Sequence, residues 1–154
     1  MQIKDFREKP SFIEDNRDAV NHEIGILHFF RSSDSRHHVK AGYFYDKEIA
    51  KGDNWDYWGN KFVAGIQYTL PTEIKFTADY EYKELHYEHE TLFLIIFAGG
   101  KRKDREENIT AALSKNISKN LGVSLEYLRS KNRSNIFLYS YEKNLYSTGI
   151  TWKW

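Results

Sequence analysis

Residues 74–83 read Ile-Lys-Phe-Thr-Ala-Asp-Tyr-Glu-Tyr-Lys, and apolar and polar side chains alternate through the whole stretch. In an extended chain, the apolar side chains from Ile74 to Tyr82 point to one side and the polar ones from Lys75 to Lys83 to the other. A period of two residues is typical of a β-strand with two unlike faces. The sequence therefore predicts a strand over 74–83.

The same alternation recurs along the chain and decides the fold class. Further strands are predicted over 22–30, 39–45, 61–70, 109–117, 121–127 and 146–154. Apolar residues seldom recur at helical spacing between these segments, so neighbouring strands should be antiparallel, without helical crossovers. We predict an all-β, antiparallel, up-and-down transmembrane β-barrel of about seven to eight strands, complete or as part of a larger barrel. Residues 1–154 form this one domain, with 1–17 as a loop or partial strand.

The composition narrows the class of protein further. The 154 residues fit one domain, cysteine is absent, and 23 Lys+Arg against 22 Asp+Glu leave a formal net charge of +1. The absence of cysteine excludes disulfide frameworks and Cys-ligated metal sites, and the neutral balance argues against a nucleic-acid partner. Aromatic residues make up 16 % of the chain, which argues against disorder.

The predicted connections alternate in length. Short connections at 32–36, 71–73 and 118–120 are each followed by a long one, at 46–60, 84–107 and 130–143. Outer-membrane barrels have short periplasmic turns and longer outer loops in this order. The alternation requires the apolar run 91–97 to be part of a long loop rather than a strand of its own.

Three features favour an apolar face that points to lipid over one that points to a soluble interior. The opposite face is rich in small or charged residues, aromatic residues collect near strand ends, and several apolar positions hold only alanine. We accordingly predict a hydrated lumen. The lumen-facing residues are expected to be Gln67, Lys75, Asp79, Glu81, Glu126 and Lys153. The alternative is a soluble β-barrel that binds an apolar small ligand in its cavity.

The last residues, Ser-Thr-Gly-Ile-Thr-Trp-Lys-Trp over 147–154, resemble the terminal assembly signal of bacterial outer-membrane barrels. In that signal a polar residue and a glycine precede hydrophobic residues at the third-last and last positions. Ser147, Gly149, Trp152 and Trp154 occupy these positions here. An aromatic residue at the membrane interface and a glycine at a close approach suit a strand presented by its edge.

The wider sequence, from about Asp18 onward, is similar to the C-terminal part of Gram-negative outer-membrane β-barrels of the porin type, which often follow tetratricopeptide repeats. The matching stretches are 51–59 leading to Leu70-Pro71, 101–104, Ser134-Asn135 with Tyr139 and Tyr141, and the closing strand. The chain begins without the basic start and apolar stretch of an export signal. We expect it either to stay inside the cell or to be a mature or truncated form that lacks upstream strands.

The resemblance implies a pore, channel or membrane anchor in the bacterial outer membrane, for export or uptake of a solute. Its partners would be outer-membrane lipid and lipopolysaccharide, the barrel-assembly machinery and an upstream periplasmic repeat domain. A third alternative is a recognition barrel that works through its long loops.

No residue pattern predicts catalysis, a metal site or a cofactor. His37-His38 and the pair His86 and His89 lack the converging spacing of zinc ligands, and we expect solvated histidines. No nucleophile motif accompanies the acidic residues, so the protein is not expected to be an enzyme. The basic run 101–105 is expected to be a solvated loop. Aromatic residues at Trp55, Tyr57 and Trp58 are expected to pack a loop against the barrel rim, with stacking on a sugar ring as the alternative.

Overall fold

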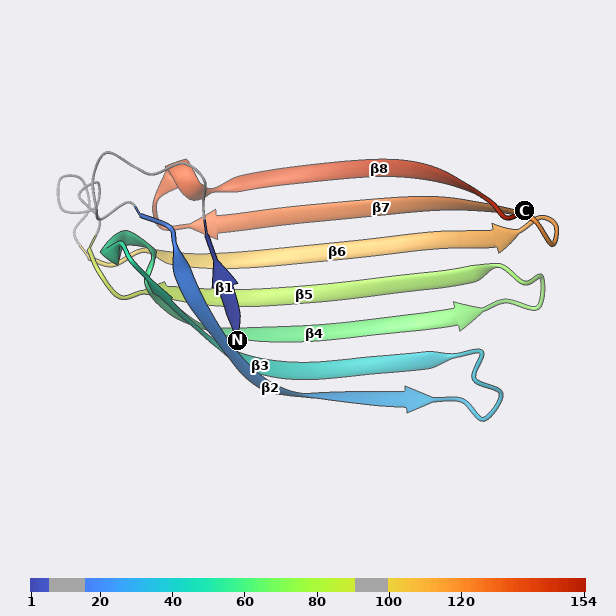
Figure 1. Cartoon of the computed structure of the whole chain (residues 1–154), viewed down its shortest axis with the longest axis horizontal. Coiled ribbons are helices and arrows are strands. Elements are labelled where there is room, and N and C mark those ends of the chain that lie inside the picture. Colours follow the sequence, from blue (N-terminus) through green and yellow to red (C-terminus); the bar gives the residue numbers. More distant parts are fainter. Residues whose placement is uncertain (6–15, 91–99) are drawn as a thin grey trace.

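The computed structural model is built of β-strands and describes residues 1–5, 16–90 and 100–154 (Figure 1). The strands are β1 (Gln2–Lys4), β2 (Ala19–Arg31), β3 (His38–Ala50), β4 (Tyr57–Thr69), β5 (Lys75–Tyr87), β6 (Lys103–Asn116), β7 (Leu121–Ser134) and β8 (Tyr141–Trp152). Two single-turn 3₁₀ helices, η2 (Asp53–Trp55) and η3 (Phe137–Tyr139), precede β4 and β8. Over these ranges no helix has the length and apolar character needed to cross a membrane.

All eight strands lie in one sheet in the order of the sequence, and each is antiparallel to the next. This confirms the predicted all-β, antiparallel, up-and-down class. The sheet is not closed. At one edge β1 pairs only Gln2–Lys4 with residues 19–21 of β2, and at the other β8 has a partner only in β7 among the described strands.

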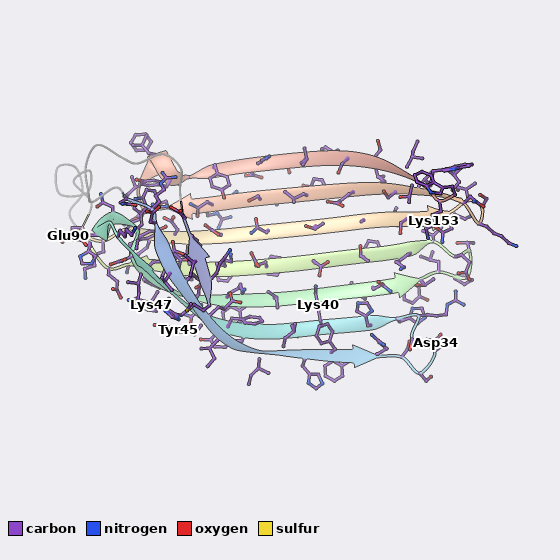
Figure 2. All side chains as sticks on the ribbon, viewed as in Figure 1. Asp34, Lys40, Tyr45, Lys47, Glu90 and Lys153 are labelled. Atoms are coloured by element: carbon purple, nitrogen blue, oxygen red, sulfur yellow. The ribbon has the colours of Figure 1, made fainter. Side chains whose placement is uncertain are left out.

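The two ends of the sheet differ, and we name them by their connections. The turn end carries 32–37, 70–74 and 117–120, and the loop end carries 51–56, 88–102 and 135–140. Figure 2 labels Asp34 and Lys153 at the turn end and Glu90 at the loop end. The C-terminus therefore lies at the turn end (Figure 1).

The predicted alternation of short and long connections is wrong. From β2 to β8 the connections contain 6, 6, 5, 15, 4 and 6 residues, and among these only 88–102 is long. The reason is that all seven long strands continue past their predicted limits at the loop end, where polar or charged residues interrupt the apolar side chains on the apolar face. The run 91–97, predicted as loop, lies outside the described residues.

Hydrogen bonds fix the turns at the turn end. In 32–37 the Ser32 hydroxyl and the Arg36 backbone N–H both donate to the Asp34 carboxylate, which lowers the pKa of that carboxyl. Arg36 also reaches the neighbouring turn, where its Nη2 lies 3.0 Å from Glu73 Oε1. Glu73 has φ 60°, a left-handed conformation that closes the tight turn after Pro71.

The most buried residues gather at the loop end and are largely polar. Four apolar residues are buried there, Ala19, Leu85, Tyr87 and Ile136. The buried polar residues are Asp18, Asn21, Asp46, Glu48, Arg102, Asp104 and Asn132. Large apolar side chains are instead exposed over the rest of the sheet, which is the reverse of a soluble protein with a dry core.

Candidate functional site

The two faces of the sheet have opposite chemistry, and the register assigns each side chain to one of them. The polar face carries Asp46, Gly59 and Leu85, which are paired in one row across β3, β4 and β5. The apolar face carries the alternate residues, among them Ile66 and Leu125, which are 42 % and 51 % exposed. Residues buried among polar partners thus alternate with exposed apolar residues along the same strands.

Apolar side chains form a continuous strip, the apolar belt, across the apolar face of β3 to β8. The members are Val39, Ala41, Tyr43, Tyr45, Phe62, Ala64, Ile66, Tyr68, Phe76, Ala78, Tyr80, Tyr82, Ile109, Ala111, Leu113, Leu121, Val123, Leu125, Tyr127, Tyr146, Ile150 and Trp152. On β2 the belt continues with Ile24, Ile26 and Phe30. Apart from β6, each belt strand from β3 to β8 has an aromatic residue at one or both limits.

The belt runs obliquely across the strands. Tyr43 is paired in one row through β4 to β7 with Glu142 of β8. Yet the belt ends at Tyr45 on β3, two residues from that row toward the loop end, and at Tyr146 on β8, four residues from it toward the turn end. The belt limit therefore shifts by six residues over five strand steps. With about 3.3 Å per residue and about 4.8 Å between strands, this is an angle of about 40° between the belt and the direction perpendicular to the strands.

Charged residues follow the belt directly on the loop-end side of the apolar face. Glu142 accepts from two cations of β7, with 2.7 Å to Arg129 Nη2 and 2.9 Å to Lys131 Nζ. Looser pairs join Arg105 to Glu84 at 3.4 Å and Arg133 to Glu107 at 3.8 Å. Apart from Arg129, these residues were predicted to lie in long loops, and all of them lie in strands.

The polar face carries ion pairs that reach across an intervening strand or lie along one strand. Lys61 pairs with Glu23, and Lys83 Nζ lies 3.4 Å from Glu81 Oε1. The amide of Asn108 donates to the same Glu81 carboxylate at 3.2 Å. The polar face thus presents charges of both signs, held against one another.

An acidic cluster occupies the loop end of the polar face on β2 to β4. The Asn21 amide donates to Asp46 Oδ1 at 2.6 Å and to Glu48 Oε2 at 3.2 Å, and the Tyr57 hydroxyl lies within 3.3 Å of both carboxylates. Lys4 of β1 pairs with Glu48. β1 is therefore held to the sheet by an ion pair as well as by its three residues that pair with β2.

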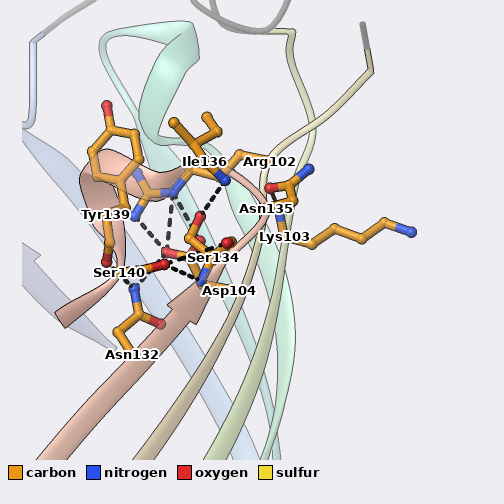
Figure 3. A network of polar contacts seen from close by, with 9 residues as sticks. All are labelled: Arg102, Lys103, Asp104, Asn132, Ser134, Asn135, Ile136, Tyr139 and Ser140. Carbon is orange, nitrogen blue, oxygen red and sulfur yellow. Dashed lines mark hydrogen bonds and ion pairs between the residues drawn. The ribbon is translucent and has the colours of Figure 1, made fainter. Parts of the chain in front are cut away.

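A second buried network joins β6, β7 and η3 (Figure 3). The Arg102 guanidinium pairs with Asp104 through two nitrogens, and it lies 3.5 Å from the centre of the Tyr139 ring and 4.2 Å from that of Tyr87. Asn132 donates to Asp104 Oδ2 at 3.3 Å and to the Tyr139 carbonyl at 2.7 Å. Arg102 and Asp104 are 5 % and 1 % exposed, so this ion pair is buried at the loop end.

The basic run 101–105 was predicted to be a solvated loop, and this is wrong. Lys103 to Arg105 belong to β6, and Arg102 and Asp104 are buried. The strand's alternation explains the difference, because every second residue of the run turns to the polar face. A charge run with opposite signs at alternate positions would have been the sequence signal for this strand.

The residues predicted to face the lumen lie as follows. Gln67, Asp79 and Glu81 are on the polar face of β4 and β5, and Asp79 pairs with Lys40 at 2.5 Å. Lys75 begins β5 and is exposed, and Glu126 is exposed on the polar face of β7. Lys153 follows the end of β8, where its backbone N–H donates to the Asn120 carbonyl at 2.9 Å. The polar-face charges Lys40, Asp46, Glu48, Lys61, Lys83 and Glu106 were not among the predicted residues.

The residues of the predicted assembly signal divide between the two faces of β8. Ser147 and Gly149 lie on the polar face, and a Cβ added to Gly149 would stand 2.6 Å from Ser124 Oγ. Trp152 lies on the apolar face and is 63 % exposed, and Trp154 follows the strand. The glycine therefore sits at a close approach between β7 and β8.

The three aromatic residues predicted for loop packing or sugar stacking do not share a surface. Trp55 in η2 is half-buried beside Arg17 and Tyr139, and Tyr57 binds the acidic cluster. Only Trp58 is exposed, on the apolar face of β4, where it stacks on His86 at 4.3 Å. Sugar stacking stays a prediction, restricted by this geometry to Trp58.

The histidines are separated by the fold. His86 lies in β5 and stacks on Trp58 of β4, and His37 stacks on Tyr68 at the turn end. Asp53, Asp56 and His89 come within ligand distance of one another at the loop end, with Asp53 and His89 exposed. Exposed acidic groups often meet without a metal, and the Asp56 carboxylate already accepts from the Ala50 backbone N–H.

The comparisons with known proteins give one match. A family model described as surface lipoprotein assembly modifier matches residues 4–152. No curated protein and no solved structure matches the chain. The matched family is related to the Gram-negative outer membrane, as the resemblance implied, but it is not the predicted porin type and it does not indicate tetratricopeptide repeats.

Proposed function

The chain belongs to the surface lipoprotein assembly modifier family, and on that basis we propose that its strands span the outer membrane as part of a β-barrel that acts in lipoprotein assembly at the cell surface. The apolar belt faces lipid, and the polar face lines a hydrated passage or supports the barrel as an anchor. No catalytic group and no cofactor take part in this role. The partners are outer-membrane lipid, lipopolysaccharide, the barrel-assembly machinery and the lipoprotein itself.

The oblique belt is the observation that carries the proposal. Strands of membrane barrels tilt by roughly 35–45° from the barrel axis, so a belt level with the membrane must deviate by a similar angle from the direction perpendicular to the strands. Across β3 to β8 the register and the strand spacing give a deviation of about 40° from that perpendicular. The seven long strands have 12 to 14 residues, and about 9–11 residues are enough to cross the hydrocarbon region.

The exposure of the polar face supports contact with water on the side of the sheet opposite the apolar belt. Ion pairs such as Lys40–Asp79 and Lys83–Glu81 are partly exposed, with side chains between 27 % and 46 % accessible. Charges of both signs along the same face suit weak selectivity toward a passing chain. In a soluble barrel with an apolar ligand, this charged face would point to the solvent and the apolar belt would line the cavity.

Membrane fractionation of the exported protein tests the proposal. We expect it to sediment with outer membranes and to show heat-modifiable gel mobility in mild detergent. Recovery in the soluble fraction without detergent would contradict the membrane location.

The assembly role is tested by deleting the gene and measuring how much of a cognate lipoprotein is accessible to added protease on whole cells. Accessibility should fall and should be restored by the parent protein, and unchanged accessibility would contradict the role.

A further inference from the structure

Five cations stand together on the apolar face of β6 and β7, between the apolar belt and the loop end. This basic patch consists of Lys103, Arg105, Arg129, Lys131 and Arg133. Three carboxylates lie among and beside it, on Glu84, Glu107 and Glu142. The patch therefore keeps an excess of positive charge on the face that also carries the belt.

Two arginines in the patch face each other without a strong counter-ion. Arg105 and Arg133 are direct cross-strand partners, and both side chains are 62 % accessible. Their carboxylate neighbours stand at 3.4 and 3.8 Å, whereas Glu142 is held at 2.7 and 2.9 Å by Arg129 and Lys131. Like charges directly opposite each other destabilise a strand pair, and an anion between them removes that cost.

The position of the patch selects the anion. Arg129 is the next outward residue after Tyr127 at the belt's limit, so the patch begins where the hydrocarbon region would end. Arg105 stands two outward positions beyond Ile109, about 13 Å along the strand. Guanidinium groups bind phosphate through two parallel hydrogen bonds, and long cationic side chains at this level reach the headgroup layer.

We infer that the basic patch binds the phosphate groups of lipopolysaccharide, with Arg105 and Arg133 together clamping one phosphate. The site lies on the outer wall of the barrel, so the ligand is an annular lipid and not a solute in the passage. The inference rests on the proposed membrane span, and it takes the end that carries the long connection 88–102 as the outer one, because outer-membrane barrels have short periplasmic turns and longer outer loops. Binding there stabilises the loop ends of β6 and β7 against the lipid layer.

Binding of lipopolysaccharide to the purified full chain in detergent tests this inference. The variant Arg105→Gln/Arg133→Gln should bind at least tenfold more weakly than the parent, with a weaker salt dependence. The control Lys75→Gln/Lys143→Gln removes the same charge from the polar face and should bind within twofold of the parent. Removing the phosphates from lipid A should weaken its binding to the parent protein. The loss of affinity should equal the loss that phosphorylated lipid A shows with the arginine variant.

Competition experiments identify the source of the phosphate. Phosphatidylglycerol micelles and inorganic phosphate, at the same phosphate concentration, should compete poorly. Equal competition by either, or binding by the arginine variant within twofold of the parent, would overturn the inference. Heat-modifiable mobility is measured on every sample, so a protein that folds as a membrane barrel but does not bind lipopolysaccharide overturns the patch alone and leaves the proposed function standing.

Discussion

Lys40 Nζ and Asp79 Oδ1 lie 2.5 Å apart although their strands, β3 and β5, are not neighbours. β4 runs between them, and Gly65 is the residue in register with both. A Cβ on Gly65 would stand 2.4 Å from Asp79 Oδ1 and 2.5 Å from Lys40 Cε. The glycine therefore allows an ion pair to bridge three strands on the polar face.

The Lys40–Asp79 pair should contribute little to stability despite its short distance. Both side chains are about as accessible as those of surface ion pairs, at 33 % and 46 %, so water screens the attraction. In a double-mutant cycle with Lys40→Gln and Asp79→Asn, we expect a coupling of at most about 1 kcal/mol in the free energy of unfolding. A coupling of several kcal/mol would mean that the polar face is much drier than proposed.

Removal of the Arg102 guanidinium should be far more costly. Asp104 is 1 % exposed, and Arg102→Met leaves its buried carboxylate without the cation. Breaking a buried ion pair from one side costs about 3–5 kcal/mol. Urea unfolding followed by tryptophan fluorescence measures this loss. The exposed Arg105 of β6, three residues after Arg102, provides the control, since Arg105→Gln should change the free energy of unfolding by no more than about 0.5 kcal/mol. Equal effects of the two substitutions would contradict the buried network.

A methyl group at Gly25 should strain the β2–β3 pair. An added Cβ would stand 2.3 Å from the Tyr43 carbonyl oxygen and 2.7 Å from Phe44 Cα, and backbone atoms cannot move aside as side-chain ends do. We expect Gly25→Ala to destabilise the protein by about 1–3 kcal/mol in urea unfolding. Gly122→Ala is the matched control, because its nearest neighbour is the Asn116 side chain at 3.2 Å. A loss at Gly122 as large as that at Gly25 would argue against the close approach.

The sequence predicts the fold class because the belt strands have two clearly unlike faces. The segment 74–83 is within a few residues of β5, and 61–70 is close to β4. Each prediction failed at the loop end, where Arg105, Glu107 and Arg129 are charged on the face that carries apolar residues in the belt. Ion pairs replace the apolar side chains there, so hydrophobic alternation stops while the strand continues.

The candidate site was less accessible to sequence reasoning. Gln67, Asp79 and Glu81 lie within the apolar-polar segments, and alternation alone places them opposite the apolar belt; that this face lines a lumen stays a prediction. Arg102 and Asp104 meet Tyr139 from a distant connection, and no local pattern predicts that contact. The pairing of Arg105 with Arg133 also depends on the β6–β7 register, which the sequence does not fix.

The orientation of the apolar belt is tested most directly by arginine substitutions at adjacent residues of β4. Ile66 lies in the middle of the belt, and Gln67 lies on the polar face. In lipid vesicles, Ile66→Arg should lower the free energy of unfolding by about 2–4 kcal/mol, because a charge near the bilayer midplane loses its hydration. Gln67→Arg should change it by no more than about 0.5 kcal/mol. Equal losses at the two positions, or a larger loss at Gln67, would contradict the proposal that the belt faces lipid.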